Sequence, residues 1–183
     1  MTASLSKNHS LEEVSLSNPE FKGWVVGARI SDFVMGNVEQ PVLIFSIHAP
    51  SLKQGTYERH VNHILDEISK IKGNTPLILA GDFNLTTAAI RHPNEEMKNT
   101  AGEKKILERL RTEFGVQNSW QYLHKDEDLP QTLRWTNNPT KPFHCDAIFL
   151  SDDLLKHLVS AEVPSTGIWG TMSDHNPVIA VLE

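Results

Sequence analysis

The sequence predicts an α/β domain in which helices cover layers of β-sheet. Two observations lead to this fold class. Short apolar and β-branched runs of strand length recur along the chain, and two longer segments between them repeat apolar residues at intervals of three and four. Strands mixed with helices over 183 residues favour a layered domain with its own core.

The first clear pattern begins at Gly23. Residues 1–22 are polar and aperiodic, so they predict a mobile N-terminal segment ahead of a domain that spans 23–183. Apolar and β-branched residues then dominate Gly23–Ile30 and Pro41–Ile47. We expect these two segments to form neighbouring strands.

The middle of the chain carries the helical signals. Apolar residues at spacings of three and four predict a helix over Tyr57–Ile71, which Gly73 can end. Leu77–Ala80 is wholly apolar and suits a strand buried on both faces. A second helix is predicted over Glu103–Phe114. Further strands are expected at Leu133–Thr136, Cys145–Leu150, His157–Val163 and Val178–Leu182.

Composition bounds the function without defining it. The formal net charge of −6 argues against a broad basic surface that grips nucleic acid through many phosphates. A phosphate substrate stays open, because bound metal ions can supply positive charge locally. Cys145 is the single cysteine, which excludes an intrachain disulfide and favours a reducing cytoplasm. No apolar run is long enough to span a membrane, and residues 1–20 lack a secretory pattern.

Two motifs place metal-capable groups at the ends of strands. Gly-Asp-Phe-Asn at 81–84 follows an apolar run, and on extended backbone Asp82 and Asn84 point the same way. They suit a cation or an activated water, although a turn with an Asx cap explains the same residues. Asp174 and His175 precede the last strand and suit a metal ligand beside a general base. A helix cap or a loop hydrogen bond is the alternative for that pair.

Two further positions complete the set. Asp146 alternates with His144 on one face of a predicted strand, opposite Cys145, and an aspartate so placed can fix the tautomer of a histidine ring. An edge strand with solvated polar residues is the alternative. His48 closes the strand that ends at Ile47, where a simple hydrogen bond is the alternative to a catalytic role.

Together these four segments resemble the endonuclease/exonuclease/phosphatase superfamily, which has the DNase I-like fold. The resemblance runs from about Gly23 to the C-terminus. Its specific parts are Gly-Asp-Phe-Asn at 81–84 and Ser-Asp-His-Asn-Pro at 173–177, in the family order, with the strand of Asp146 between them. It implies a two-sheet sandwich flanked by helices, and divalent-metal-dependent hydrolysis of phosphodiesters.

The resemblance also implies roles for individual residues. Asp82 would orient or activate the attacking water and contact the metal, Mg²⁺ or alternatively Mn²⁺, and Asn84 would hold the water and the phosphate. Asp174 would be a metal ligand. His175 would act as a base or stabilise the transition state, supported by Asp146.

His48 would bind phosphate or assist the leaving oxygen.

The chain departs from the family pattern upstream of Gly23. Family members begin with a strand ending in Asn, then a helix, then a strand whose Glu is the main metal ligand. Neither segment is found here, so the sandwich is expected to lack its first two strands and first helix. Glu12, Glu13 and Glu20 are the only carboxylates upstream, and none closes an apolar strand.

Several interpretations remain open at this point. The chain can be a fragment, a truncated product, or a protein completed by a second chain that supplies the missing strands. The leading function is a nuclease, with a phosphatase of small phosphoesters or a degenerate, non-catalytic binding module as alternatives. Trp169 and Met172, just before Asp174, can stack on a base or sugar or can pack in the core.

Overall fold

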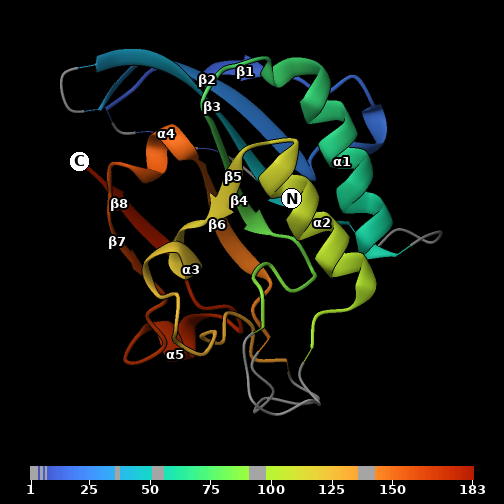
Figure 1. The fold of residues 1–183 in the computed structure, drawn as a ribbon, viewed down its shortest axis with the longest axis vertical. Coiled ribbons are helices and arrows are strands. Elements are labelled where there is room, and N and C mark those ends of the chain that lie inside the picture. Colours follow the sequence, from blue (N-terminus) through green and yellow to red (C-terminus); the bar gives the residue numbers. More distant parts are fainter. Residues whose placement is uncertain are drawn as a thin grey trace.

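The computed structural model describes residues 4, 6, 8–35, 38–50, 56–90, 98–135 and 143–183 (Figure 1). Its strands are β1 (Glu12–Val14), β2 (Val25–Met35), β3 (Val38–His48), β4 (Leu77–Asp82), β5 (Val116–Asn118), β6 (Asp146–Ser151), β7 (Leu158–Glu162) and β8 (Ile179–Leu182). Its helices are the 3-10 turn η1 (Pro19–Phe21) and the α-helices α1 (Tyr57–Lys72), α2 (Ala101–Thr112), α3 (Ser119–Leu123), α4 (Asp152–Leu155) and α5 (Trp169–Met172).

The strands form two sheets. Six strands make a mixed sheet in the order β1-β2-β3-β4-β6-β5, and β7 and β8 make a separate antiparallel pair. Only β3 and β4 run parallel among the strand pairs of the described residues. The crossover through α1 makes this possible, and it brings the carboxyl ends of β3 and β4 to the same edge.

Local signals in the sequence define the helix ends. The hydroxyl of Thr56 caps α1 by accepting from the Arg59 amide, and Gly73 follows its last residue with a φ of 52°, a conformation that favours glycine. Thr100 and Glu103 form a capping box at the start of α2. Within the described residues, no helix is both long and apolar enough to cross a membrane.

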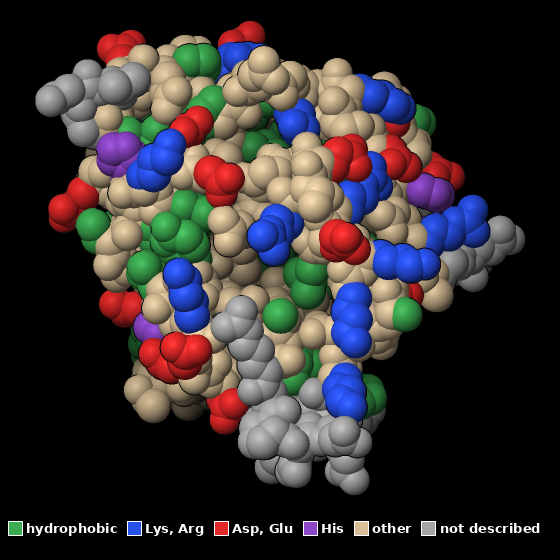
Figure 2. Space-filling model, in the orientation of Figure 1, with side chains coloured by type: hydrophobic (Ala, Val, Ile, Leu, Met, Phe, Trp, Pro, Cys, Tyr) green, Lys and Arg blue, Asp and Glu red, His purple; other side chains and the backbone are tan. Residues whose placement is uncertain are grey.

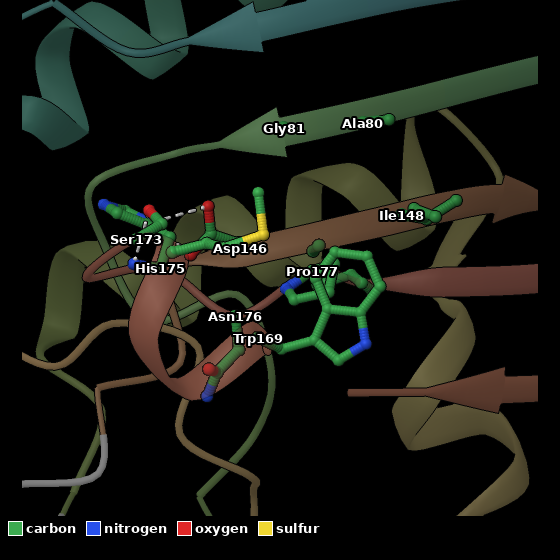
Figure 3. Close-up of a pocket in the computed structure, with 12 residues that line it drawn as sticks. Ala80, Gly81, Asp146, Ile148, Trp169, Ser173, His175, Asn176 and Pro177 are labelled. Carbon is green, nitrogen blue, oxygen red and sulfur yellow. Dashed lines mark hydrogen bonds and ion pairs between the residues drawn. The ribbon is translucent and has the colours of Figure 1, made fainter. Parts of the chain in front are cut away.

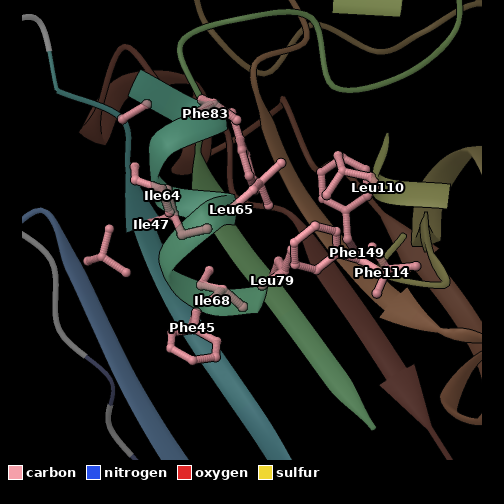
Figure 4. Close-up of a cluster of buried hydrophobic side chains, with 14 of the residues drawn as sticks. Phe45, Ile47, Ile64, Leu65, Ile68, Leu79, Phe83, Leu110, Phe114 and Phe149 are labelled. Carbon is pink, nitrogen blue, oxygen red and sulfur yellow. The ribbon is translucent and has the colours of Figure 1, made fainter. Parts of the chain in front are cut away.

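The six-stranded sheet is packed on both faces. On one face α1 and α2 cover a core that includes Phe45, Leu79, Ile68 and Leu110 (Figure 4). On the other face a second cluster joins the sheet to β7, β8 and α4; its buried members are Met35, Val42, Ile78, Leu150, Leu154, Leu155 and Leu158. Neighbouring residues of β4 therefore face different clusters, which confirms that the apolar run is buried on both sides.

The sequence predicted the long elements and missed the short ones. Both long helices and the strand pair before them are confirmed, with ends shifted by a few residues. The strand expected at Leu133–Thr136 is wrong: Leu133 makes only single-residue bridges to Phe143 and His175, and Thr136 lies outside the described residues. β5, α3, α4 and α5 were not predicted, because three to five residues carry no readable period.

The segment before Gly23 also contains regular structure. Val14 in β1 pairs with Gly27 of β2, and the side chain of Phe21 is buried in the core under α1. Asn18 caps η1 by accepting from the Glu20 amide. A division of the chain between residues 22 and 23 stays a prediction.

Candidate active site

The parallel pairing of β3 and β4 places His48 beside Asp82. These residues end their strands and are register partners, and Nε2 of His48 lies 3.9 Å from Oδ2 of Asp82. Gly81 allows this close approach, because a β-carbon at that position would overlap the carbonyl oxygen of Ile47. Its φ of 131° also lies where glycine is favoured. The ring of His48 further contacts Trp24 edge-on, with centroids 5.2 Å apart.

Asp146 lies opposite Asp82 on the next strand. It begins β6, and in the antiparallel β4–β6 pair it is the register partner of Asp82. The buried hydroxyl of Thr132 accepts hydrogen bonds from the amides of Cys145, at 2.9 Å, and Asp146, at 3.1 Å. Thr132 thereby fixes the backbone from which the Asp146 carboxylate projects.

His175 joins these residues from a distant part of the chain. Its Nδ1 lies 2.9 Å from Oδ2 and 3.1 Å from Oδ1 of Asp146, and its amide donates to the Ser173 hydroxyl at 3.0 Å. The hydrogen bond to Asp146 is the main cause that raises the pKa of His175, and the Asp82 charge adds to it. Both carboxylates therefore make protonation of His175 more favourable than protonation of a free imidazole.

The two facing carboxylates are electrostatically strained. Burial raises the pKa of Asp82, and the nearby Asp146 charge raises it further, against the opposing effects of the Asn84 amide and the histidines. Two anionic groups in a half-buried site repel each other unless a cation lies between or beside them. A hard divalent cation with oxygen ligands fits this arrangement.

Among the described residues, one group of three metal-capable side chains has its ligand atoms within 4.8 Å of one another: Cys145, Asp146 and His175. Burial raises the pKa of the Cys145 thiol, which favours its protonated form, a poor ligand for Mg²⁺. Asp82 and Asp174 lie outside that group. Asp174 is exposed, and its Oδ1 lies 3.4 Å from the Ser173 hydroxyl.

Asn84 sits where the chain turns away from β4. Its φ of 53° is the left-handed conformation that asparagine tolerates, and its amide donates to Oδ1 of Asp82 at 2.8 Å. Its side-chain Nδ2 donates to the Ala49 carbonyl, just past His48, at 3.0 Å. Asn84 thus connects the ends of β3 and β4 and orients the Asp82 carboxylate. The Asx turn and a position beside the candidate site are therefore compatible.

One expectation about this region is wrong. Asp146 was expected to share a face with His144, opposite Cys145. Instead the Cys145 thiol lies 3.6 Å from Oδ2 of Asp146, while the buried His144 ring contacts the Pro130 carbonyl at 2.8 Å. The alternation rule fails because β6 begins only at Asp146, so Cys145 is not yet on strand backbone.

Arg134 fastens the loop that carries His175. Its guanidinium donates to the Asn176 side chain and to the carbonyls of Ser173 and Trp169, the last at 3.3 Å. Its amide donates to the Asp174 carbonyl at 2.7 Å. This role of Arg134 was not predicted from the sequence, because hydrogen bonds between residues 35 to 42 positions apart leave no local pattern.

A pocket of about 520 Å³ opens beside the Asp146–His175 pair (Figure 3). One wall comes from β4 and β6, and the other comes from α5 and the loop that follows it. The lining residues are Ala80, Gly81, Asp146, Ala147, Ile148, Trp169, Met172, Ser173, His175, Asn176, Pro177 and Val178. The site is therefore a cleft with an acid–imidazole pair at one end and an apolar interior.

The chain has the DNase I-like fold, as the resemblance predicted. Solved structures similar to it include an AP endonuclease from Archaeoglobus fulgidus, with a TM-score of 0.72 and 15% identity over 96% of this chain and 72% of that one. A 3′ phosphatase from Neisseria, bound to a product DNA hairpin, matches with a TM-score of 0.71 at the same identity and coverage.

A third similar structure is the AP endonuclease LMAP from Leishmania major, with a TM-score of 0.62 and 13% identity over 85% of this chain and 53% of that one. No protein-family model and no curated protein matches the sequence. At such low identity the structural matches to the AP endonuclease and the 3′ phosphatase establish the fold alone. The substrate and the catalytic residues of this chain have to be inferred from the geometry and chemistry of its own site.

Proposed function

We propose that this chain hydrolyses phosphodiester bonds of nucleic acid by metal-assisted attack of water on phosphorus. The observation that carries the proposal is the Asp146–His175 pair, whose Nδ1–Oδ2 distance is 2.9 Å, beside Asp82 at one edge of the sheet. A carboxylate-held imidazolium next to a second carboxylate supplies the acid and the base that hydrolysis needs. The DNA-bound 3′ phosphatase among the similar structures supports a nucleic-acid substrate.

The proposed reaction uses residues of three strand ends and one loop. Asp82 orients a water molecule and accepts its proton as the water oxygen bonds to phosphorus. The P–O bond to the leaving group breaks, and His175 donates its proton to the departing oxygen while Asp146 stabilises the imidazolium. His48 contacts the phosphate or the leaving oxygen. Asn84 holds Asp82 in position through its amide, 2.8 Å from Oδ1.

A divalent metal fits this proposal. Asp82 and Asp146 would hold Mg²⁺ or Mn²⁺, because their facing carboxylates are otherwise repulsive, and Asp174 would add a ligand from the loop. The metal would neutralise charge that builds on the phosphoryl oxygens. Cys145 would stay protonated and outside the ligand set.

Two alternative functions are a phosphatase of small phosphoesters and a non-catalytic binding module. A phosphatase of small phosphoesters would use the same residues and is favoured by the net charge of −6, which disfavours tight, nonspecific binding to DNA. On the face that Figure 2 shows, basic and acidic side chains are interspersed and form no broad basic surface for DNA. A degenerate binding module would keep the fold without turnover.

The test is hydrolysis of bis-p-nitrophenyl phosphate and of plasmid DNA with Mg²⁺ or Mn²⁺, compared with EDTA. We expect metal-dependent turnover that Asp82→Ala and His175→Ala each lower by orders of magnitude without unfolding the chain. His63→Ala, at an exposed position on α1, is the matched control and should behave as wild type. Equal turnover in wild type and both site variants would refute the assignment, and a folded chain without turnover would favour the binding module.

A second chain belongs to the same proposal. Among the described residues β7 and β8 pair only with each other, so a strand from a second chain could add at an edge of this pair. If a second chain completes the site there, turnover per chain should rise with protein concentration. Constant turnover per chain across a hundredfold dilution would argue against a second copy in that role.

A further inference from the structure

Most of the lining of the pocket beside His175 is apolar. Its apolar lining includes Ala80, Ile148, Pro177 and Val178, and its volume of about 520 Å³ lies in the range of small-molecule sites. Asp146 and His175 line the same pocket, so a group bound inside it would be attached close to the scissile phosphate. In Figure 3 the indole of Trp169 extends into this space from the side opposite β6.

Two large apolar side chains of α5 form the outer wall and are not part of the core. Trp169 is 43% exposed and Met172 is 69% exposed, so the core-packing interpretation of these residues is wrong. Both line the pocket while facing solvent. An exposed indole and a flexible thioether beside a reactive centre form a surface on which a flat ring can stack.

The wall is held in place by the chain itself. The Arg134 guanidinium donates to carbonyls at both ends of the α5 segment, those of Trp169 and Ser173. The buried Asn176 side chain accepts from Arg134 and donates to the Gln131 carbonyl at 2.7 Å. Trp169 therefore lies on a segment that these hydrogen bonds hold in place, which lowers the ordering cost of binding.

We propose that this pocket binds a nucleobase of the substrate, stacked on Trp169, next to the phosphodiester that is hydrolysed. The inference rests on the proposed function and gives it a substrate class: phosphodiesters that carry a nucleoside, in preference to sugar or alkyl phosphates. The amide of Asn176 is already hydrogen-bonded at both ends, which leaves the pocket few polar groups for reading base edges. Binding is thus tolerant of base identity, as stacking platforms are.

The first experiment compares two diesters with the same leaving group, thymidine 5′-(p-nitrophenyl phosphate) and methyl p-nitrophenyl phosphate. We expect kcat/KM for the thymidine ester to be higher by roughly tenfold to hundredfold, the range that stacking of one base supplies. Trp169→Ala should bring the ratio close to one, whereas Trp169→Phe should keep most of it. Trp135→Ala is the matched control, since Trp135 is 48% exposed but does not line the pocket, and it should retain the wild-type ratio.

The second experiment measures binding without turnover. Thymidine and adenosine, which carry no phosphate, should quench tryptophan fluorescence of the wild type to similar extents, and Trp169→Phe should abolish that quenching. Ribose 5-phosphate should not quench. Quenching by nucleosides in a chain that hydrolyses neither diester would support the pocket and refute the proposed function.

The reverse pattern overturns the pocket alone. Turnover of both diesters with equal kcat/KM, unchanged in Trp169→Ala and with no quenching by nucleosides, would keep the hydrolase and refute the base-binding site. A strong preference for adenosine over thymidine in the fluorescence experiment would also contradict the inference, because stacking on an apolar wall does not discriminate in that way.

Discussion

The two sheets of this molecule are packed to different degrees. On the six-stranded sheet, the face under α1 and α2 is closed: Phe45 and Leu79 have no measurable exposure. The outer face of the β7–β8 pair is open, with Ile179 at 39% and Val181 at 42% exposed. In Figure 1 the closed side lies with α1 and α2, and β7, β8 and α5 lie together on the other side.

The candidate site lies where these two regions meet, and each supplies different chemistry. The closed region supplies His48, Asp82 and Asp146 from strand ends that hydrogen bonds hold in register. The open region supplies Trp169 from α5 and His175 from the loop that follows it. Rigid elements position the charged groups, and the less tightly packed segment brings the proposed proton donor and the proposed substrate contact, a division common in enzymes.

The largest expected effect is a loss of activity on replacing His175, which lies where the closed and open regions meet. His175→Ala removes the proposed proton donor, which bridges the two regions, so kcat/KM for bis-p-nitrophenyl phosphate should fall by roughly 10²- to 10⁴-fold. Urea unfolding should change little, because the His175 side chain is one-third exposed. A loss of rate matched by a large loss of stability would mean that His175 joins the regions structurally and not catalytically.

The next effect tests the packing contrast directly. Phe45→Ala opens a cavity in the closed core and should lower the free energy of unfolding by about 3–5 kcal/mol. Val181→Ala, on the open face of β8, should change it by less than about 0.5 kcal/mol. Urea denaturation of the two variants measures the difference. Similar losses in both would show that the outer face of β8 is covered in solution.

The sequence predicted the closed region well, and the reason is physical. α1 must bury one stripe of side chains, which produces apolar residues at spacings of three and four. β4 must bury both of its faces, which produces a continuous apolar run. The strand-end motifs could be found for the same reason, because an apolar run makes the polar group that follows it visible. Gly81 and Asp82 are the clearest case.

The open region could not be predicted in the same way. α5 has four residues, too few to show a period, and its exposed Trp169 is indistinguishable in sequence from a core tryptophan. The contacts of Thr132 and Arg134 with the Asp146 strand and the His175 loop join residues 14 and about 40 positions apart. Such contacts depend on tertiary packing, which no local pattern encodes.

A smaller effect is expected from replacing Arg134, whose hydrogen bonds hold the loop that carries His175. Arg134→Gln removes charged donors to the Asn176 side chain and the Ser173 carbonyl, so the loop should loosen and kcat should fall by roughly tenfold to hundredfold. Arg134→Lys should restore only part of this, since one ammonium cannot reproduce the fork. Arg111→Gln, at an exposed position on α2, is the control. A change in KM without a change in kcat would contradict a role in positioning His175.

The last prediction asks whether the N-terminal segment belongs to the closed region. Buried Glu67 on α1 accepts hydrogen bonds from the Ser17 hydroxyl and, at 2.9 Å, from the Asn18 amide, and it pairs with Lys70. The hydrogen bonds from Lys70 and Ser17 lower the pKa of Glu67 from 4.5 to about 2. Glu67→Gln should therefore cost about 1–3 kcal/mol at pH 7.

The sign of the pH dependence gives the sharper test. Because the pKa of Glu67 is lower in the folded state, its contribution to stability is complete above about pH 4.5 and is lost as the pH falls toward 2. The free energies of unfolding of wild type and Glu67→Gln should thus converge over this range, whereas Glu108→Gln, at an exposed position on α2, should follow the wild type throughout. Amide exchange at Asn18 that is equally fast in wild type and Glu67→Gln would instead favour a segment that is mobile, as the sequence predicted.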